Sequence, residues 1–200
     1  GESGAGKTMN ANFIIDYIQK STFQGSSPRL QTIKKIIRSS VGLLEAMGNA
    51  KTIRNNNSSR FGKLLEIRFN AANEISGSHI TPFMLETARI TNVTENNRSF
   101  HIFYQLIAVN NQYTEGLGME DVSHFKYLRD GLTIADNIND VEGFEETLTA
   151  LKDINISDED IKSFFQIIAG VAHLGNIEFE AISDSESRVA NRDGMLSYRY

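Results

Sequence analysis

The chain opens with Gly1-Glu2-Ser3-Gly4-Ala5-Gly6-Lys7-Thr8, which has the Gly-x-x-x-x-Gly-Lys-Thr spacing of a phosphate-binding loop. Glycines let several backbone N–H groups converge on one anion, while the lysine supplies positive charge and the threonine hydroxyl suits Mg²⁺. Apolar residues then follow at helical spacing, at Ala11, Ile14, Ile15 and Ile18. The loop therefore leads into a helix whose N-terminus faces the phosphates, which predicts a nucleoside triphosphate as ligand. The alternative is a glycine-rich turn before a helix.

The composition is that of one soluble globular domain, since 40% of the 200 residues are hydrophobic and 22% are charged. The absence of cysteine excludes disulfides and thiolate metal sites. A net charge of −5 gives no overall basic field for nucleic acid, so we expect no nucleic-acid partner. The longest apolar stretch is too short to cross a bilayer, so we also expect no transmembrane segment. Five basic residues nevertheless lie in or beside the segments assigned to phosphates: Lys7, Lys51, Arg54, Arg60 and Lys63.

Periodicity and turn chemistry predict the remaining elements. The stretch 21–28 is expected to be a surface loop, and a second amphipathic helix is expected from Leu30 to Leu44. Alternation over residues 63–69 predicts a strand, followed by a turn at residues 76–78 and an extended segment through Ile90, a hairpin joined to a larger sheet. Further helices are expected from about Ser99, after Asp140, and from a capping box at Ser157 to a stop at Gly175.

The segment 55–63 contains three asparagines, two serines and an arginine before Phe61-Gly62-Lys63. These side chains cannot form a core, because each would need a buried hydrogen-bond partner. We interpret the segment as a polar loop between a helix and a strand. Its hydroxyls suit Mg²⁺, its carboxamides suit phosphate oxygens, and its guanidinium suits a phosphate or a carboxylate. The alternative is a solvent-exposed Asn/Ser loop without a ligand.

Together, Gly1 to Thr8 and Asn55 to Lys63 resemble the phosphate loop and switch I of the myosin motor domain. Further matching segments follow in the family's order: residues 87–90, 100–106, 125–128 and 172–179. The resemblance implies an α/β fold of the P-loop NTPase type, with a partial motor domain over 1–180, a helical subdomain from about 99 to 180, and a divergent segment over 181–200. Substitutions at Met9, Val41, Ala88 and Asn97 suggest a divergent unconventional myosin. Because no switch II sequence Asp-x-x-Gly-Phe-Glu occurs, we expect the chain to be an excerpt.

The resemblance also implies a role for each matching position. The nucleotide-binding residues would be Gly1, Glu2, Ser3, Gly4, Ala5, Gly6, Lys7, Thr8, Asn55 and Ser58. Thr8 and Ser59 would be the protein ligands of Mg²⁺. The catalytic set would be Lys7, Asn55, Ser58, Ser59 and Arg60. Within that set, Lys7 would bridge the β- and γ-phosphates, and Arg60 would pair with a downstream switch II glutamate to close the pocket.

As a function, the resemblance implies a cytoplasmic, ATP-driven motor of the actin cytoskeleton. Such an enzyme is an actin-activated ATPase that uses ATP and Mg²⁺, and the isolated 200-residue piece is expected to be inactive. Its partners would be filamentous actin and, through a neck outside this chain, a light chain or calmodulin. Two alternatives stay open at this point: another P-loop NTPase, such as a kinesin-like motor on microtubules, and a nucleotide-binding actin tether without turnover.

Overall fold

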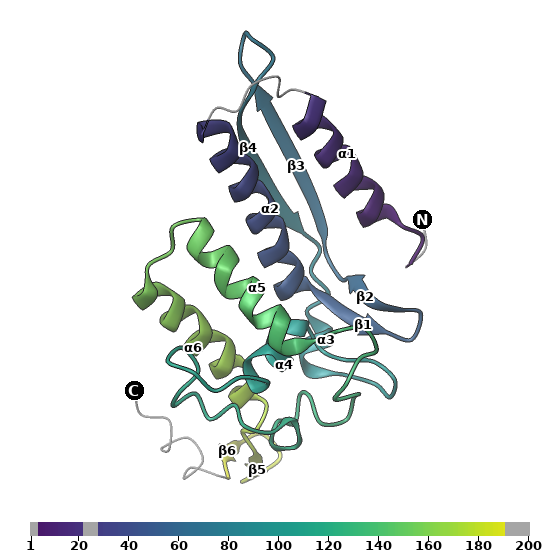
Figure 1. Cartoon of the computed structure of the whole chain (residues 1–200). Helices are drawn as coiled ribbons and strands as arrows, with labels where there is room; N and C mark the ends of the chain where they lie inside the picture. Colours follow the sequence, from purple (N-terminus) through teal and green to yellow (C-terminus); the bar gives the residue numbers. More distant parts are fainter. Residues whose placement is uncertain (1–3, 22–27, 191–200) are drawn as a thin grey trace.

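The computed structural model describes residues 4–21 and 28–190 (Figure 1). Its elements are α1 (Lys7–Ser21), α2 (Pro28–Gly48), β1 (Asn49–Thr52), β2 (Asn55–Ser59), β3 (Gly62–Phe69), β4 (Ile75–Phe83), α3 (Ala88–Thr91), α4 (His101–Ile107), the 3₁₀ turn η1 (Val122–His124), α5 (Asp140–Asp153), α6 (Asp158–Leu174), β5 (Phe179–Ala181) and β6 (Ser187–Val189). Residues 1–3, most of the expected surface loop 21–28, and residues 191–200 lie outside the described residues.

A helical layer holds the core. Helix α5 lies beside α2, with α6 on its other side and α4 beneath them (Figure 1). Phe100, Phe144 and Phe165 are at least 98% buried there, and the rings of Phe144 and Phe165 pack 5.2 Å apart. Burying large aromatic side chains at helical spacing supplies most of the stabilisation of such a layer. The predicted helices after Asp140 and Ser157 are both confirmed.

Helix α6 begins and ends where its capping residues indicate. The Ser157 side chain accepts a hydrogen bond from the Asp160 backbone N–H at 3.1 Å, and its hydroxyl donates to the Asp160 carboxylate at 2.8 Å. Ser157 is therefore the N-cap, and Asp160 stands at the position of the usual capping-box glutamate but is bonded by the Ser157 hydroxyl and not by its backbone N–H. The helix stops at Leu174, with Gly175 as its C-cap, as predicted.

The polar segment 55–59 is a strand, so its interpretation as a loop is wrong. Residues of β2 pair antiparallel with β1, in the register Asn49 with Ser59 and Ala50 with Ser58. Asparagine has a low intrinsic preference for strands. Backbone hydrogen bonds to β1 outweigh that preference, because they do not depend on which side chains the strand carries.

Strands β3 and β4 form the predicted hairpin, with two differences. Residues 76–78 lie inside β4, and the turn instead spans 70–74, where Asn73 has a φ of +59° and Asn70 accepts the backbone N–H groups of Ala72 and Glu74. Asparagine tolerates the left-handed region and bonds its own backbone, so it makes this turn without glycine. The extended segment ends at Phe83, and residues 88–91 form the short helix α3. The described residues form three two-stranded sheets, so the expected larger sheet remains a prediction.

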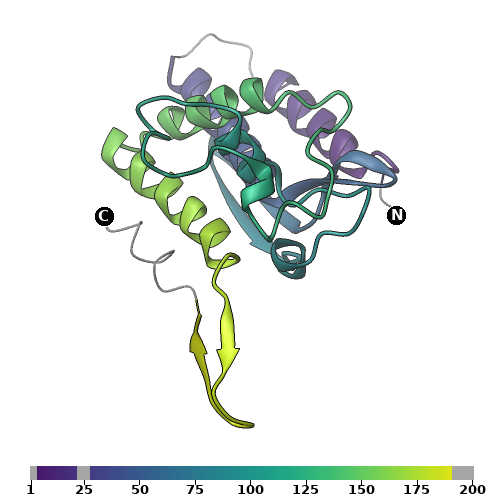
Figure 2. The same cartoon turned by 90° about the horizontal axis from the view of Figure 1, so that it is seen from below.

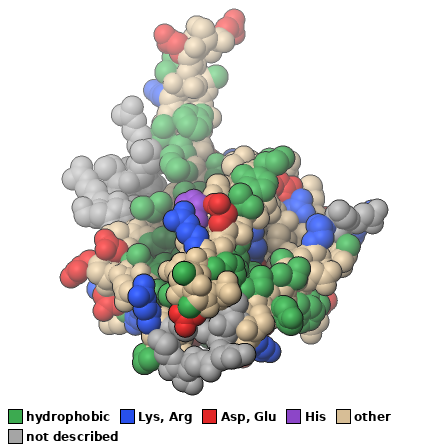
Figure 3. Space-filling view, turned by 90° about the horizontal axis from the view of Figure 1, so that it is seen from above, with side chains coloured by type: hydrophobic (Ala, Val, Ile, Leu, Met, Phe, Trp, Pro, Cys, Tyr) green, Lys and Arg blue, Asp and Glu red, His purple; other side chains and the backbone are tan. Residues whose placement is uncertain are grey.

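Helix α1 lies along the β3–β4 hairpin (Figure 1), and its Asp16 forms an ion pair with Arg38 of α2. Several apolar side chains of α1 are exposed: Met9, Phe13, Ile14 and Tyr17. At the opposite end, the β5–β6 hairpin projects from the body (Figure 2). From above, hydrophobic side chains are interspersed with acidic and basic ones over the molecular surface (Figure 3). Among the residues described, no helix combines the length and the apolar character needed to cross a membrane.

Candidate functional site

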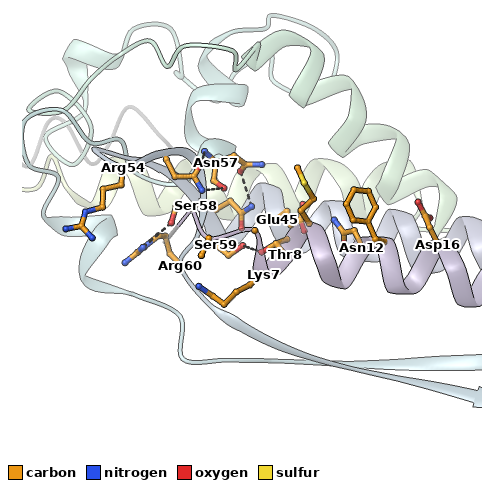
Figure 4. Close-up of a pocket in the computed structure, with 17 residues that line it drawn as sticks. Lys7, Thr8, Asn12, Asp16, Glu45, Arg54, Asn57, Ser58, Ser59 and Arg60 are labelled. Carbon is orange, nitrogen blue, oxygen red and sulfur yellow. Dashed lines mark hydrogen bonds between the residues drawn. The ribbon is translucent and has the colours of Figure 1, made fainter. Parts of the chain in front are cut away.

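A cleft of about 870 Å³ lies between the start of α1 and strand β2 (Figure 4). Its lining residues are Gly4, Ala5, Gly6, Lys7, Thr8, Met9, Asn12, Phe13, Asp16, Glu45, Asn49, Arg54, Asn55, Asn57, Ser58, Ser59 and Arg60. Every predicted site residue within the described ranges is in this set. Gly1, Glu2 and Ser3 lie outside those ranges. The fold therefore brings together two segments that are about fifty positions apart in the sequence.

The loop before α1 has the backbone conformation that its glycines permit. Gly4 has a φ of +83° and Gly6 a φ of +82°, both in the left-handed region that side chains disfavour. Helical hydrogen bonding begins at once, since the Asn10 N–H donates to the Gly6 carbonyl at 2.8 Å. The N-terminal end of the 15-residue helix α1 thus borders the cleft, and its N–H groups and dipole favour an anion there.

Two hydroxyl groups meet where the two segments come together. Thr8 Oγ1 lies 3.3 Å from Ser59 Oγ (Figure 4). A hard cation such as Mg²⁺ takes oxygen ligands, and a pair of adjacent neutral hydroxyls leaves its other positions for water and phosphate oxygens. Within the described residues, no group of three histidine or acidic side chains could hold a metal. The residues at this point fit Mg²⁺ bound together with an anionic ligand.

The local geometry beside Ser59 depends on Gly48. The Arg60 backbone N–H donates to the Gly48 carbonyl at 2.8 Å, and a Cβ at Gly48 would lie 2.5 Å from Cδ1 of Phe61. That separation is shorter than real carbon contacts. Glycine at this helix end therefore lets Phe61 approach α2, which places the end of β2 against the cleft.

The charged groups of the cleft leave a positive balance. Lys7, Arg54 and Arg60 line it, together with the carboxylates of Asp16 and Glu45. Both carboxylates already have a basic partner on another element: Asp16 lies 2.6 Å from Arg38 and Glu45 lies 2.8 Å from Lys63. With three basic and two acidic side chains, the lining of the cleft carries a net positive charge, which favours a polyanionic ligand.

The predicted basic cluster is divided in the structure. Lys51 does not line the cleft, and its ammonium donates to the Thr52 carbonyl at 3.1 Å. Lys63 forms an ion pair with Glu45 at the side of the cleft. In Figure 4, Arg54 lies at the far end of β2 from Thr8 and Ser59. Lys7 and Arg60 are therefore the basic residues nearest the hydroxyl pair among those labelled.

The guanidinium of Arg60 joins strand β2 to the segment after β4. Its Nε lies 2.6 Å from Glu86 Oε2, and its Nη1 donates to Ser58 Oγ at 3.1 Å. Arg89 contacts the same Glu86 oxygen at 2.8 Å. Partial burial acts to raise the pKa of Glu86, but hydrogen bonds and charge from Arg60 and Arg89 outweigh it, so its pKa is lowered. Glu86 is ionised at neutral pH and fixes the orientation of Arg60.

The predicted phosphate-contacting groups Asn55 and Ser58 already have hydrogen bonds to neighbouring residues of the chain. The Asn55 carboxamide bonds the backbone of Asn57, donating to its carbonyl at 3.2 Å and accepting from its N–H at 3.0 Å. Ser58 is buried and accepts a hydrogen bond from Arg60. Both side chains line the cleft in these conformations.

Sequence reasoning missed several residues of the cleft wall, among them Asn12, Asp16, Glu45, Asn49 and Asn57. Asn12 and Asp16 lie one and two turns beyond Thr8 on α1, so helical spacing could have placed them on the same face. Glu45 and Asn49 come from the end of α2, and only tertiary packing brings them here. Asn49 is 1% exposed and its Oδ1 has no hydrogen-bond partner in the described structure. A buried acceptor without a partner at the wall of a polar cleft is the expected result when a ligand or water completes the site.

Comparison with known proteins identifies the family. A family model of the myosin head (motor domain) matches residues 1–198, which includes most of the segment 181–200. The Myosin ID heavy chain of Dictyostelium discoideum is 39% identical over 198 residues, 95% of this chain and 18% of that protein. The Myosin-I heavy chain of the same organism is 42% identical over 182 residues, 90% of this chain and 8% of that protein. Myosin-1 of Pyricularia oryzae is 42% identical over 195 residues, 96% of this chain and 16% of that protein.

The chain belongs to the myosin head family. It spans less than a fifth of the length of the curated relatives that it matches. The resemblance inferred from the phosphate loop and switch I is thereby confirmed, as is the α/β character of the fold.

Proposed function

We propose that the protein containing this chain binds and hydrolyses MgATP and couples the reaction to actin filaments as a cytoskeletal motor. The observation that carries the proposal is the 3.3 Å approach of the Thr8 and Ser59 hydroxyls across a cleft with basic walls. The phosphate loop and switch I come from different elements, so their meeting at one point is a property of the fold. The membership of the myosin head family supports the same assignment.

In this proposal, the backbone from Glu2 to Lys7 surrounds the β-phosphate, and Lys7 lies between the β- and γ-phosphates. Thr8 and Ser59 hold Mg²⁺, which supplies charge neutralisation for the transferred phosphoryl group. Asn55 and Ser58 are assigned to the phosphates and to the neighbourhood of the attacking water. Phosphoryl transfer needs little covalent help from a protein, so these residues act by position and charge.

Arg60 is assigned to closure of the pocket. Its guanidinium has five N–H donors, and the contacts with Glu86 and Ser58 use Nε and Nη1. The orientation fixed by Glu86 leaves Nη2 available for a further carboxylate outside this chain. Closure of this kind excludes water other than the attacking one and aligns the charges around the γ-phosphate.

For the whole protein, we propose ATP and Mg²⁺ as the nucleotide and metal, filamentous actin as the partner, and a light chain or calmodulin on a neck beyond this chain. The proposed location is the cytoplasmic actin cytoskeleton.

The test is the steady-state ATPase rate of the full-length protein, with and without actin filaments. We expect slow turnover alone and faster turnover with filaments. An ATPase rate that actin filaments do not change would reject the proposed motor function. Binding of ATP without hydrolysis would favour an actin tether. Co-sedimentation with actin but not with microtubules separates the proposal from a kinesin-like motor.

A further inference from the structure

The side chain of Asn57 attaches strand β2 to strand β1 and to helix α4. Its Oδ1 lies 3.0 Å from Asn49 Nδ2 and 3.2 Å from His101 Nε2. Asn49 begins β1 and His101 begins α4, so one carboxamide joins three elements. In Figure 4, Asn57 lies on the other side of the β2 ribbon from Lys7 and Arg60. Asn57 also lines the cleft beside Thr8 and Ser59, but its carboxamide oxygen is already bonded to Asn49 and His101.

Both donors of this cluster are buried, whereas Asn57 itself is exposed. Asn49 is 1% exposed and His101 is 6% exposed. An amide oxygen can only accept, so His101 Nε2 carries the hydrogen and Nδ1 does not. Burial, helped by the charge of Arg98, lowers the pKa of His101 to about 4, so the ring is neutral at pH 7 and keeps this tautomer.

Asn57 occupies the middle of β2, between the residues assigned to the nucleotide. Asn55 and Ser59 lie two positions away on either side, and the Asn55 carboxamide bonds the Asn57 backbone. Asn57 also borders a second cavity of about 300 Å³, which His101 lines as well, so solvent reaches both sides of the strand at this point. A short strand between two cavities needs a fixed point if its hydroxyls are to hold a constant geometry.

We propose that Asn57 is a positioning residue: with Asn49 and His101 it holds the centre of β2, so that Ser58 and Ser59 meet the bound nucleotide in a fixed geometry. The inference rests on the proposed ATPase function. The Asn57 contacts order β2 before the nucleotide binds, and this ordering lowers the entropy lost in reaching the transition state. Loss of this anchor is expected to slow hydrolysis more than it weakens nucleotide capture, because capture also depends on the loop before α1.

The test uses the full-length protein with the substitution Asn57→Ala. We expect the single-turnover hydrolysis rate to fall by about fivefold or more, because the bonds to Asn49 and His101 are both lost, while the apparent ATP affinity changes less than about twofold. Amide hydrogen exchange over residues 55–59 should become faster. Because Asn57 is exposed, its truncation leaves no buried cavity and the variant should fold.

Variants of His101 separate the hydrogen bond from simple packing. A glutamine amide can place a donor near the position of imidazole Nε2, so His101→Gln should retain hydrolysis. The shorter side chain of His101→Asn cannot reach Asn57, and His101→Phe has no donor. Each of these two variants should therefore show the slower hydrolysis that follows from losing the bond to Asn57. The double variant of Asn57→Ala with His101→Phe should lose no more than Asn57→Ala alone, because Asn57→Ala already removes the bond to His101.

The matched control is Asn70→Ala, which removes the same carboxamide from the turn of the β3–β4 hairpin and should leave hydrolysis unchanged. A wild-type hydrolysis rate in Asn57→Ala, unchanged amide exchange over 55–59, or fully additive losses in the double variant would each overturn the inference. Wild-type protein without any ATP turnover would instead reject the proposed function, and the exchange measurement would still decide whether Asn57 anchors β2.

Discussion

The guanidinium Nε of Arg60 lies 2.6 Å from Oε2 of Glu86, and the Glu86 backbone N–H donates to the Arg60 carbonyl at 2.9 Å. These two residues are 26 positions apart and are joined through both side chain and backbone. Arg89 holds the same carboxylate, which makes Glu86 the centre of a small ion network. The consequence is that the orientation of Arg60 is set by the segment between β4 and α3.

Replacing Arg60 with alanine should slow ATP hydrolysis by the full-length protein by about 10- to 100-fold, because the pocket loses the side chain assigned to its closure around the γ-phosphate. Nucleotide binding should change little, since the phosphate loop remains intact. Single-turnover kinetics with a parallel binding titration measure the two effects. Arg68→Ala, an exposed arginine on β3, provides the matched control. Normal turnover in Arg60→Ala would contradict its assigned role in closure.

Replacing Lys7 with alanine should weaken nucleotide binding by about 10- to 100-fold, which corresponds to the loss of a charge-assisted hydrogen bond to phosphate. Equilibrium titration with a fluorescent ATP analogue measures this. Lys20→Ala, in the last turn of the same helix, removes an equal charge away from the cleft and should bind normally. Equal affinities for the two variants would remove Lys7 from the site.

His101 should make the protein less stable as the pH falls from 7 to 5. Its pKa is about 4 in the folded protein, below the ordinary 6.5, so the unfolded chain takes up the proton first. The stabilisation is complete above pH 6.5 and is lost as the pH falls toward 4. At pH 5 the loss is about 2 kcal/mol. Thermal unfolding of the wild type and of His101→Gln at both pH values measures the difference, which should shrink in the variant. A parallel decrease in both proteins would show that His101 does not contribute.

Gly48→Ala should destabilise the protein by about 1–3 kcal/mol, because the new methyl group overlaps Phe61 and must displace it. The control is Gly42→Ala in the same helix, where a Cβ meets nothing within 4 Å and alanine favours the helix. Thermal melting of both variants gives the comparison. A melting temperature for Gly48→Ala at or above that of Gly42→Ala would show that the close contact is not required.

Residues with regular spacing and clear chemical roles could be predicted from the sequence. The apolar periodicity of α5 and α6 and the cap at Ser157 are local properties, so these helices were anticipated. The expected start of α4 at about Ser99 is two residues early, since the helix begins at His101. Helix ends are harder to predict than helix cores because few hydrogen bonds define them.

Other features depend on pairing between distant segments. The segment 55–59 has no strand signature of its own, and it becomes β2 because β1 presents its backbone alongside. Glu86, Glu45 and Asn49 reach the cleft region through tertiary packing, and nothing in their local sequence indicates it. The convergence of Thr8 and Ser59, by contrast, follows from the chemistry expected of each loop.

The link between β1 and the helical layer has a mechanical consequence. The Arg98 N–H donates to the Lys51 carbonyl at 3.0 Å, and Ala50 forms a bridge with Phe100, directly before α4. Arg98 and Phe100 are both at least 98% buried, so this attachment is stiff. A displacement of the two-stranded ribbon should therefore reach the start of α4 directly, through backbone contacts. If Ser59 moves away from Thr8, the same contacts should pull on the buried end of the helical layer, at the base of α4.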